Sequence, residues 1–131
     1  MIPYSYLAPV GRLLLALMFI LSALGKIAEP AATQGFIASV GLPLSMLAYL
    51  GAIVIELGGG ILLLLGFQAR ATSLLLAGFT LLAAVVFHHD FANQNEMIHF
   101  LKNLAIVGGL LHIAAGDAGA LSLDHRRLNR T

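Results

Sequence analysis

Four long apolar stretches constrain the fold of this 131-residue chain more than any other feature. They run from about Leu7 to Gly25, from about Leu44 to Leu65, over residues 71–87, and from about Met97 to Ala115. A helix needs about 20 mostly apolar residues to cross the hydrocarbon core of a bilayer. The sequence therefore predicts an all-α, polytopic membrane protein, with residues 1–131 forming a single bundle of four transmembrane helices.

The overall composition agrees with a membrane location. Hydrophobic residues make up 60% of the chain and charged residues only 10%, whereas soluble domains carry about 25% charged residues. A soluble protein of this composition could not cover its surface with polar groups. The net charge of +1 provides no electrostatic basis for a nucleic-acid partner.

Breaks in the apolar pattern mark the connections between spans. Glu29-Pro30, Gly41-Leu42-Pro43 and Gly66 are typical of helix ends and turns. The first connection, roughly 27–43, is itself partly apolar, so we expect it to form a short helix on the membrane interface.

Basic residues predict the orientation. With four spans, the N-terminus, the second connection and the predicted tail 116–131 lie on one side of the membrane. This side carries five arginines: Arg12, Arg70, Arg126, Arg127 and Arg130. The other side carries Lys26, and Lys102 lies slightly inside the fourth span. Because basic residues favour the cytoplasm, we expect both termini to be cytoplasmic.

Small residues predict how the spans pack. Ala52, Glu56 and Gly60 repeat every four residues in the second span, and small residues allow membrane helices to approach closely. The third span carries a similar stripe, formed by Ser73, Ala77, Thr80, Ala84 and His88. We expect these stripes to face the bundle centre, and the glycine-rich second span also suggests a homo-oligomer contact.

Polar groups within the spans are the candidates for function. Glu56 lies near the middle of the second span, where a carboxylate is costly unless it is paired, hydrated or protonated. We expect it to belong to a polar cavity in the outer half of the bundle. The predicted ligand-binding residues are Lys26, Glu56, His88, His99, Lys102 and Asn103.

Two interpretations of these groups remain open. In the functional one, the cavity binds the polar head of an amphipathic molecule such as a quinone, whose carbonyls need donors, and the histidines relay protons. In the structural one, Glu56 pairs with Lys102 or Lys26 to fix helix register, and the histidines are interfacial residues. We predict no metal site, although His88, His89, Asp90, Glu96 and His99 crowd one outer segment, because adjacent histidines at a helix end point in different directions.

The absence of cysteine removes disulfides, iron–sulfur clusters and dithiol chemistry. Any electron transfer would therefore depend on a bound cofactor, a quinone or a redox partner protein.

Several segments together resemble the DoxX family of bacterial inner-membrane proteins. They are Ser22-Ala23-Leu24-Gly25-Lys26, Gly41-Leu42-Pro43, Glu56-Leu57-Gly58-Gly59-Gly60, Phe79-Thr80 with Phe87-His88, and His99-Phe100-Leu101-Lys102-Asn103. The resemblance implies a four-helix membrane fold. It also implies an association with a quinone-linked oxidoreductase, since some relatives are linked to quinone-dependent oxidation of sulfur compounds. The alternative is a non-catalytic binding, scaffold or transport component, because no complete catalytic constellation is recognisable.

Overall fold

The computed structural model describes residues 6–88, 90–116 and 122–128, and every regular element within them is helical. The order is α1 (Leu7–Ala28), α2 (Pro30–Ser39), α3 (Ser45–Ile53), η2 (Val54–Gly58), α4 (Gly59–Leu65), α5 (Ala69–Phe87), α6 (Gln94–Ala115) and α7 (Leu123–Leu128). His89 and much of the predicted tail 116–131 lie outside the described residues.

Four helices are long and apolar enough to cross a membrane, which confirms the predicted four-span fold. They are Leu7–Ala28, Ser45–Leu65, Ala69–Phe87 and Gln94–Ala115. The second of these is one continuous helix built from α3, α4 and the π-helical turn η2 between them. The largest difference from the predicted bounds is three residues, at the end of α1 and the start of α6. The short helix expected in the first connection is present as α2.

The helix ends follow local sequence signals in most places. Pro30 occupies the first turn of α2, where its missing N–H costs no hydrogen bond. Asn93 caps α6, because its side-chain oxygen accepts a hydrogen bond from the Asn95 backbone N–H at 2.9 Å. Gly66 ends α4 with a φ of +68°, a left-handed conformation that glycine adopts without strain.

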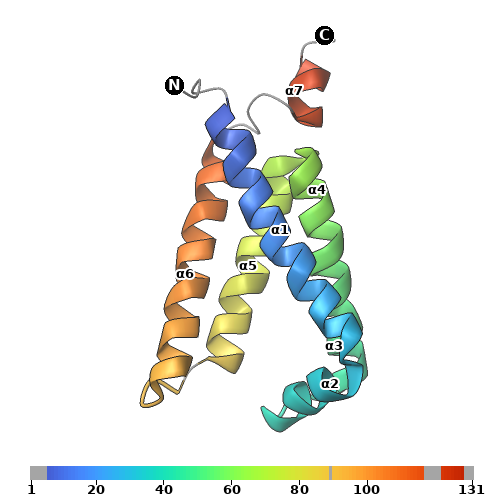
Figure 1. Cartoon of the computed structure of the whole chain (residues 1–131), viewed down its shortest axis with the longest axis vertical. Helices are drawn as coiled ribbons and strands as arrows, with labels where there is room; N and C mark the ends of the chain where they lie inside the picture. The colour runs from blue at the N-terminus through green and yellow to red at the C-terminus, as the bar shows by residue number, and fades with distance from the viewer. Residues whose placement is uncertain (1–5, 89, 117–121, 129–131) are drawn as a thin grey trace.

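The helices form two packed pairs. Helix α1 packs mainly on α4, and α5 packs mainly on α6. The pairs lie close together near the start of α1 and diverge toward the end that carries α2 (Figure 1). The buried core, formed by Ala16, Phe19, Leu63, Leu76, Ala77 and Leu110, lies between them.

Two glycines of the second span permit this packing. A Cβ at Gly60 would lie 2.9 Å from Ile20 Cγ1 and 3.3 Å from the Ala16 carbonyl oxygen, so α1 contacts α4 almost backbone to backbone. Gly59 leaves room for the Leu76 side chain of α5, whose Cδ2 would lie 2.8 Å from a Cβ at that position. At these two positions the small residues of the second span pack against other helices of the same chain, as predicted. The homo-oligomer contact through this span stays a prediction.

Buried polar contacts hold the end of the bundle near α7. The Arg12 guanidinium, which is 2% exposed, donates from Nη1 to the carbonyl oxygens of Leu63 and Leu64, both at 3.0 Å. These carbonyls belong to the last turn of α4, where the helix provides no following turn of N–H donors. The Leu63 carbonyl also accepts a hydrogen bond from the Gly66 N–H at 3.1 Å. Asp124 of α7 accepts hydrogen bonds from the backbone N–H groups of Gln68 and Ala69, both at 2.8 Å, and so caps the start of α5.

Candidate functional site

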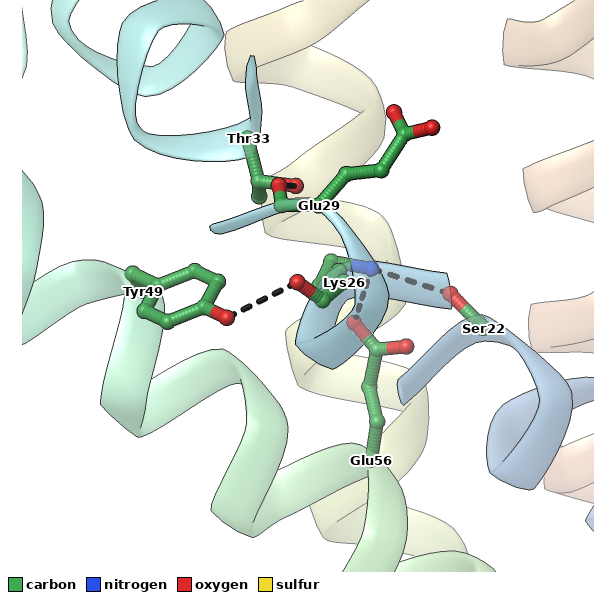
Figure 2. A network of polar contacts seen from close by, with 6 residues as sticks. All are labelled: Ser22, Lys26, Glu29, Thr33, Tyr49 and Glu56. Carbon is green, nitrogen blue, oxygen red and sulfur yellow. Dashed lines mark hydrogen bonds and ion pairs between the residues drawn. The ribbon is translucent and has the colours of Figure 1, made fainter. Parts of the chain in front are cut away.

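An ion pair between a half-buried lysine and a buried glutamate joins the first and second spans. Lys26, in the last turn of α1, places its Nζ 2.8 Å from Glu56 Oε1. The same Nζ donates to Ser22 Oγ at 2.9 Å, one helical turn earlier. The Tyr49 hydroxyl of α3 donates to the Lys26 carbonyl oxygen at 2.8 Å and holds the end of α1 against α3 (Figure 2).

The backbone around Glu56 is also unusual. Glu56 lies in the π-helical turn Val54–Gly58, where the helix is locally widened. Such turns are rare and are frequent at functional sites. Glu56 is the central residue of this turn and is buried.

One oxygen of this carboxylate receives no hydrogen bond from the part of the chain that the structure describes. Glu56 is 4% exposed, and its Oε2 is buried without a partner among the described residues. Figure 2 shows Oε1 turned toward Lys26 and the second oxygen turned away from it. A buried acceptor without a donor costs about 1–3 kcal/mol, and more when it is charged. The described residues thus leave one acceptor of the site without a hydrogen bond.

The ion pair faces a cavity of about 670 Å³ between the two helix pairs. Most of its wall is apolar, with side chains from α1, α2, α3, α5 and α6. The polar lining residues are Ser22, Lys26, Thr33, Glu56, Thr80, His88 and Asn103. A mainly apolar pocket of this size with few polar groups is typical of small-molecule sites.

Helix α2 closes one side of the cavity. Its Phe36 stacks on Phe87 at the end of α5, with ring centroids 5.3 Å apart and an interplanar angle of 26°. Ile37, on the same helix, is buried against the bundle and also lines the cavity. The short helix therefore connects the two diverging pairs through aromatic and aliphatic contacts.

A second polar cluster lies at the rim of the cavity. His88 Nδ1 is 3.1 Å from Glu96 Oε2, and the rings of His88 and His99 have centroids 5.0 Å apart. His88 lines the cavity, whereas His99 is exposed and does not. Within the described ranges, no three histidine or acidic side chains come together as a metal-binding group.

The structure brings four of the six predicted site residues to one cavity. Lys26, Glu56, His88 and Asn103 line it, and His99 reaches it only through His88. Lys102 is exposed and is not part of the lining, and of the two alternative partners for Glu56 the structure pairs Lys26 with it. Lys102 and Asn103 are adjacent on α6, and a helix turns by about 100° per residue. When Asn103 faces the cavity, Lys102 therefore points to a different side of the helix.

Sequence reasoning missed four polar residues of the site, namely Ser22, Thr33, Thr80 and Tyr49. Ser22 precedes Lys26 by four residues, a spacing that predicts a shared helix face and could have indicated the contact. Thr80 was placed on the inward stripe but was not recognised as a lining residue. Tyr49 carries no local signal for its bond to Lys26, because that contact depends on how α3 packs on α1.

The comparisons with known proteins agree with this architecture. The family model of DoxX matches residues 7–89. The chain is also 44% identical over 121 residues to the inner membrane protein YqjF of Escherichia coli (strain K12), covering 92% of this chain and 91% of that protein. It belongs to the DoxX family.

A second relative of this DoxX-family chain is the inner membrane protein YphA of Escherichia coli (strain K12). The two are 37% identical over 123 residues, which cover 89% of this chain and 87% of YphA. No solved structure matches the chain. Together with the four apolar helices, these relatives identify a multi-pass protein of the inner membrane.

Proposed function

We propose that this DoxX-family protein binds a quinone-type ligand in its central cavity and serves as the quinone-interacting subunit of a membrane oxidoreductase. The observation that carries the proposal is the 670 Å³ cavity, whose apolar wall surrounds the Lys26–Glu56 pair. A quinone has an apolar tail and a polar ring, and such a cavity matches both parts.

Hydrogen bonding supports the same ligand class. The ammonium group of Lys26 has three N–H donors, and two of them are directed at Ser22 and Glu56. The remaining donor, and the side-chain amide of Asn103, suit the oxygen atoms of a quinone ring. The chain has no cysteine, so the electrons would come from a partner protein rather than from thiols of this chain.

The proposed orientation places this site toward the periplasm. Five arginines lie on the side of the spans that carries both termini, and basic residues favour the cytoplasm. In this orientation α2, His88 and Glu96 face the outer half of the membrane. A ligand would then reach the cavity from the outer leaflet.

A binding titration tests the proposal. The purified protein in lipid nanodiscs is titrated with decylubiquinone, and bound ligand is measured after separation of the discs. We expect saturable binding to the unmodified protein. Ala83→Phe, which fills the cavity from α5, should weaken binding by about tenfold or more, equivalent to about 1.4 kcal/mol.

The matched control is Ala105→Phe. Ala105 is exposed on α6 and does not line the cavity, so the same substitution there should leave binding unchanged. Unmodified protein that fails to bind decylubiquinone would refute the proposal. Retention of phospholipid in the cavity under those conditions would favour the alternative, a non-catalytic binding, scaffold or transport component.

A further inference from the structure

The unpartnered oxygen of Glu56 restricts the chemical class of a ligand that this cavity can bind. Glu56 Oε1 is occupied by Lys26, while Oε2 is buried with no donor among the described residues. An ionised carboxylate can only accept hydrogen bonds. The ligand group that completes this site must therefore carry an O–H or N–H donor.

The charge of the site restricts that donor further. Apart from His88, the charged side chains of the cavity lining are Lys26 and Glu56, which neutralise each other at 2.8 Å. A cationic donor would bring an uncompensated charge into an apolar environment and would compete with Lys26 for the carboxylate. An anionic head group would be repelled by Oε2. A neutral hydroxyl group avoids both costs.

A second unpartnered group lies in the same cavity. The Thr80 hydroxyl of α5 is buried, has no hydrogen-bond partner among the described residues, and belongs to a lining residue. A threonine hydroxyl both donates and accepts. A ligand hydroxyl has the same two capacities, so one class of ligand suits both Glu56 and Thr80.

From these contacts we infer that the cavity prefers the reduced, hydroxyl-bearing hydroquinone to the oxidised quinone, with Glu56 Oε2 accepting a hydrogen bond from a ring hydroxyl. The inference rests on the proposed function, since it concerns which form of that ligand binds. The two forms have nearly the same size and tail. However, quinone oxygens only accept hydrogen bonds, so a quinone oxygen facing Oε2 leaves both acceptors without a donor.

The test compares the two forms on the same protein. Decylubiquinone and decylubiquinol are titrated separately into nanodiscs under argon, and the quinol is kept reduced with excess dithionite. The reductant has no cysteine to act on in this chain. We expect decylubiquinol to bind about tenfold more tightly, the difference of one hydrogen bond to a charged group.

Glu56→Gln supplies a variant that should reverse the preference. Its amide oxygen can accept from Lys26 in place of Oε1, and its NH₂ group then offers a donor where Oε2 offered only an acceptor. Decylubiquinone should become the tighter ligand. Glu29→Gln is the matched control, because Glu29 is exposed and does not line the cavity, and it should keep the preference for the quinol.

The outcomes separate the two ideas. Equal affinity for both forms, or tighter binding of decylubiquinone to the unmodified protein, would overturn this inference and leave the proposed function standing. Failure of both forms to bind would overturn the proposed function and the inference with it. The comparison on the unmodified protein decides the matter even where Glu56→Gln does not fold.

Discussion

Removal of Lys26 should expose the energetic importance of the buried ion pair. Lys26→Met keeps most of the apolar stem but leaves the carboxylate of Glu56, which is 4% exposed, without its cation. Breaking a buried pair by removing one partner costs about 3–5 kcal/mol. The lysine side chain is 27% exposed, so we expect the lower end of that range, about 3 kcal/mol of the unfolding free energy.

A double-mutant cycle isolates the pair itself. Combined with Lys26→Met, Glu56→Gln removes the unpaired charge. The double variant should therefore lose about 2 kcal/mol less unfolding free energy than the two single variants lose together. A coupling of this size is within the range seen for residues in contact. The assay is SDS titration in mixed micelles, with the folded fraction measured by pulse proteolysis. Lys102→Met is the control: Lys102 is exposed away from the cavity, and the change should stay within about 0.5 kcal/mol.

Additivity would refute this reasoning. If the losses of the two single variants sum to that of the double variant within about 0.5 kcal/mol, the two side chains are energetically independent. The ion pair at 2.8 Å would then contribute nothing to the joining of α1 and η2.

Three further predictions concern packing, capping and orientation. Gly60→Ala should destabilise the protein by about 1–3 kcal/mol in the same assay, because its Cβ would press on Ile20 and the α1 backbone. Gly58→Ala should be neutral or stabilising, since a Cβ there meets nothing within 4 Å. Asp124→Ala should cost about 1 kcal/mol by removing the cap of α5. A green fluorescent protein fused to the C-terminus should fluoresce and an alkaline phosphatase fusion should be inactive, as a cytoplasmic terminus requires; the reverse result would contradict the orientation.

The inward stripe of α5 illustrates how much of the packing could be predicted. Ser73, Ala77, Thr80 and Ala84 fall on one face at helical spacing, and all four are buried. The same reasoning correctly placed Glu56 in the interior. It succeeded because the period of a helix and the volume of a side chain are local properties.

The candidate site was harder to predict because it depends on helix rotation. Lys26 and Lys102 were equally plausible partners for Glu56 from their depth in the membrane. The structure selects Lys26, because α1 packs against the second span while Lys102 is exposed on α6. The sequence patterns considered above predict neither the π-turn around Glu56 nor the stacking of Phe36 on Phe87.

The sequence by itself therefore determined the membrane location, the four spans, the family and the presence of a costly carboxylate in the second span. These follow from the length and hydropathy of continuous segments, which do not depend on how the segments meet. Only the tertiary structure decided that Lys26 is the partner of Glu56, that the other carboxylate oxygen has no donor among the described side chains and backbone, and that a cavity lies beside it. Each of these depends on the relative rotation and separation of helices that are distant in the chain, and in a bilayer those are set by side-chain packing and interhelical hydrogen bonds.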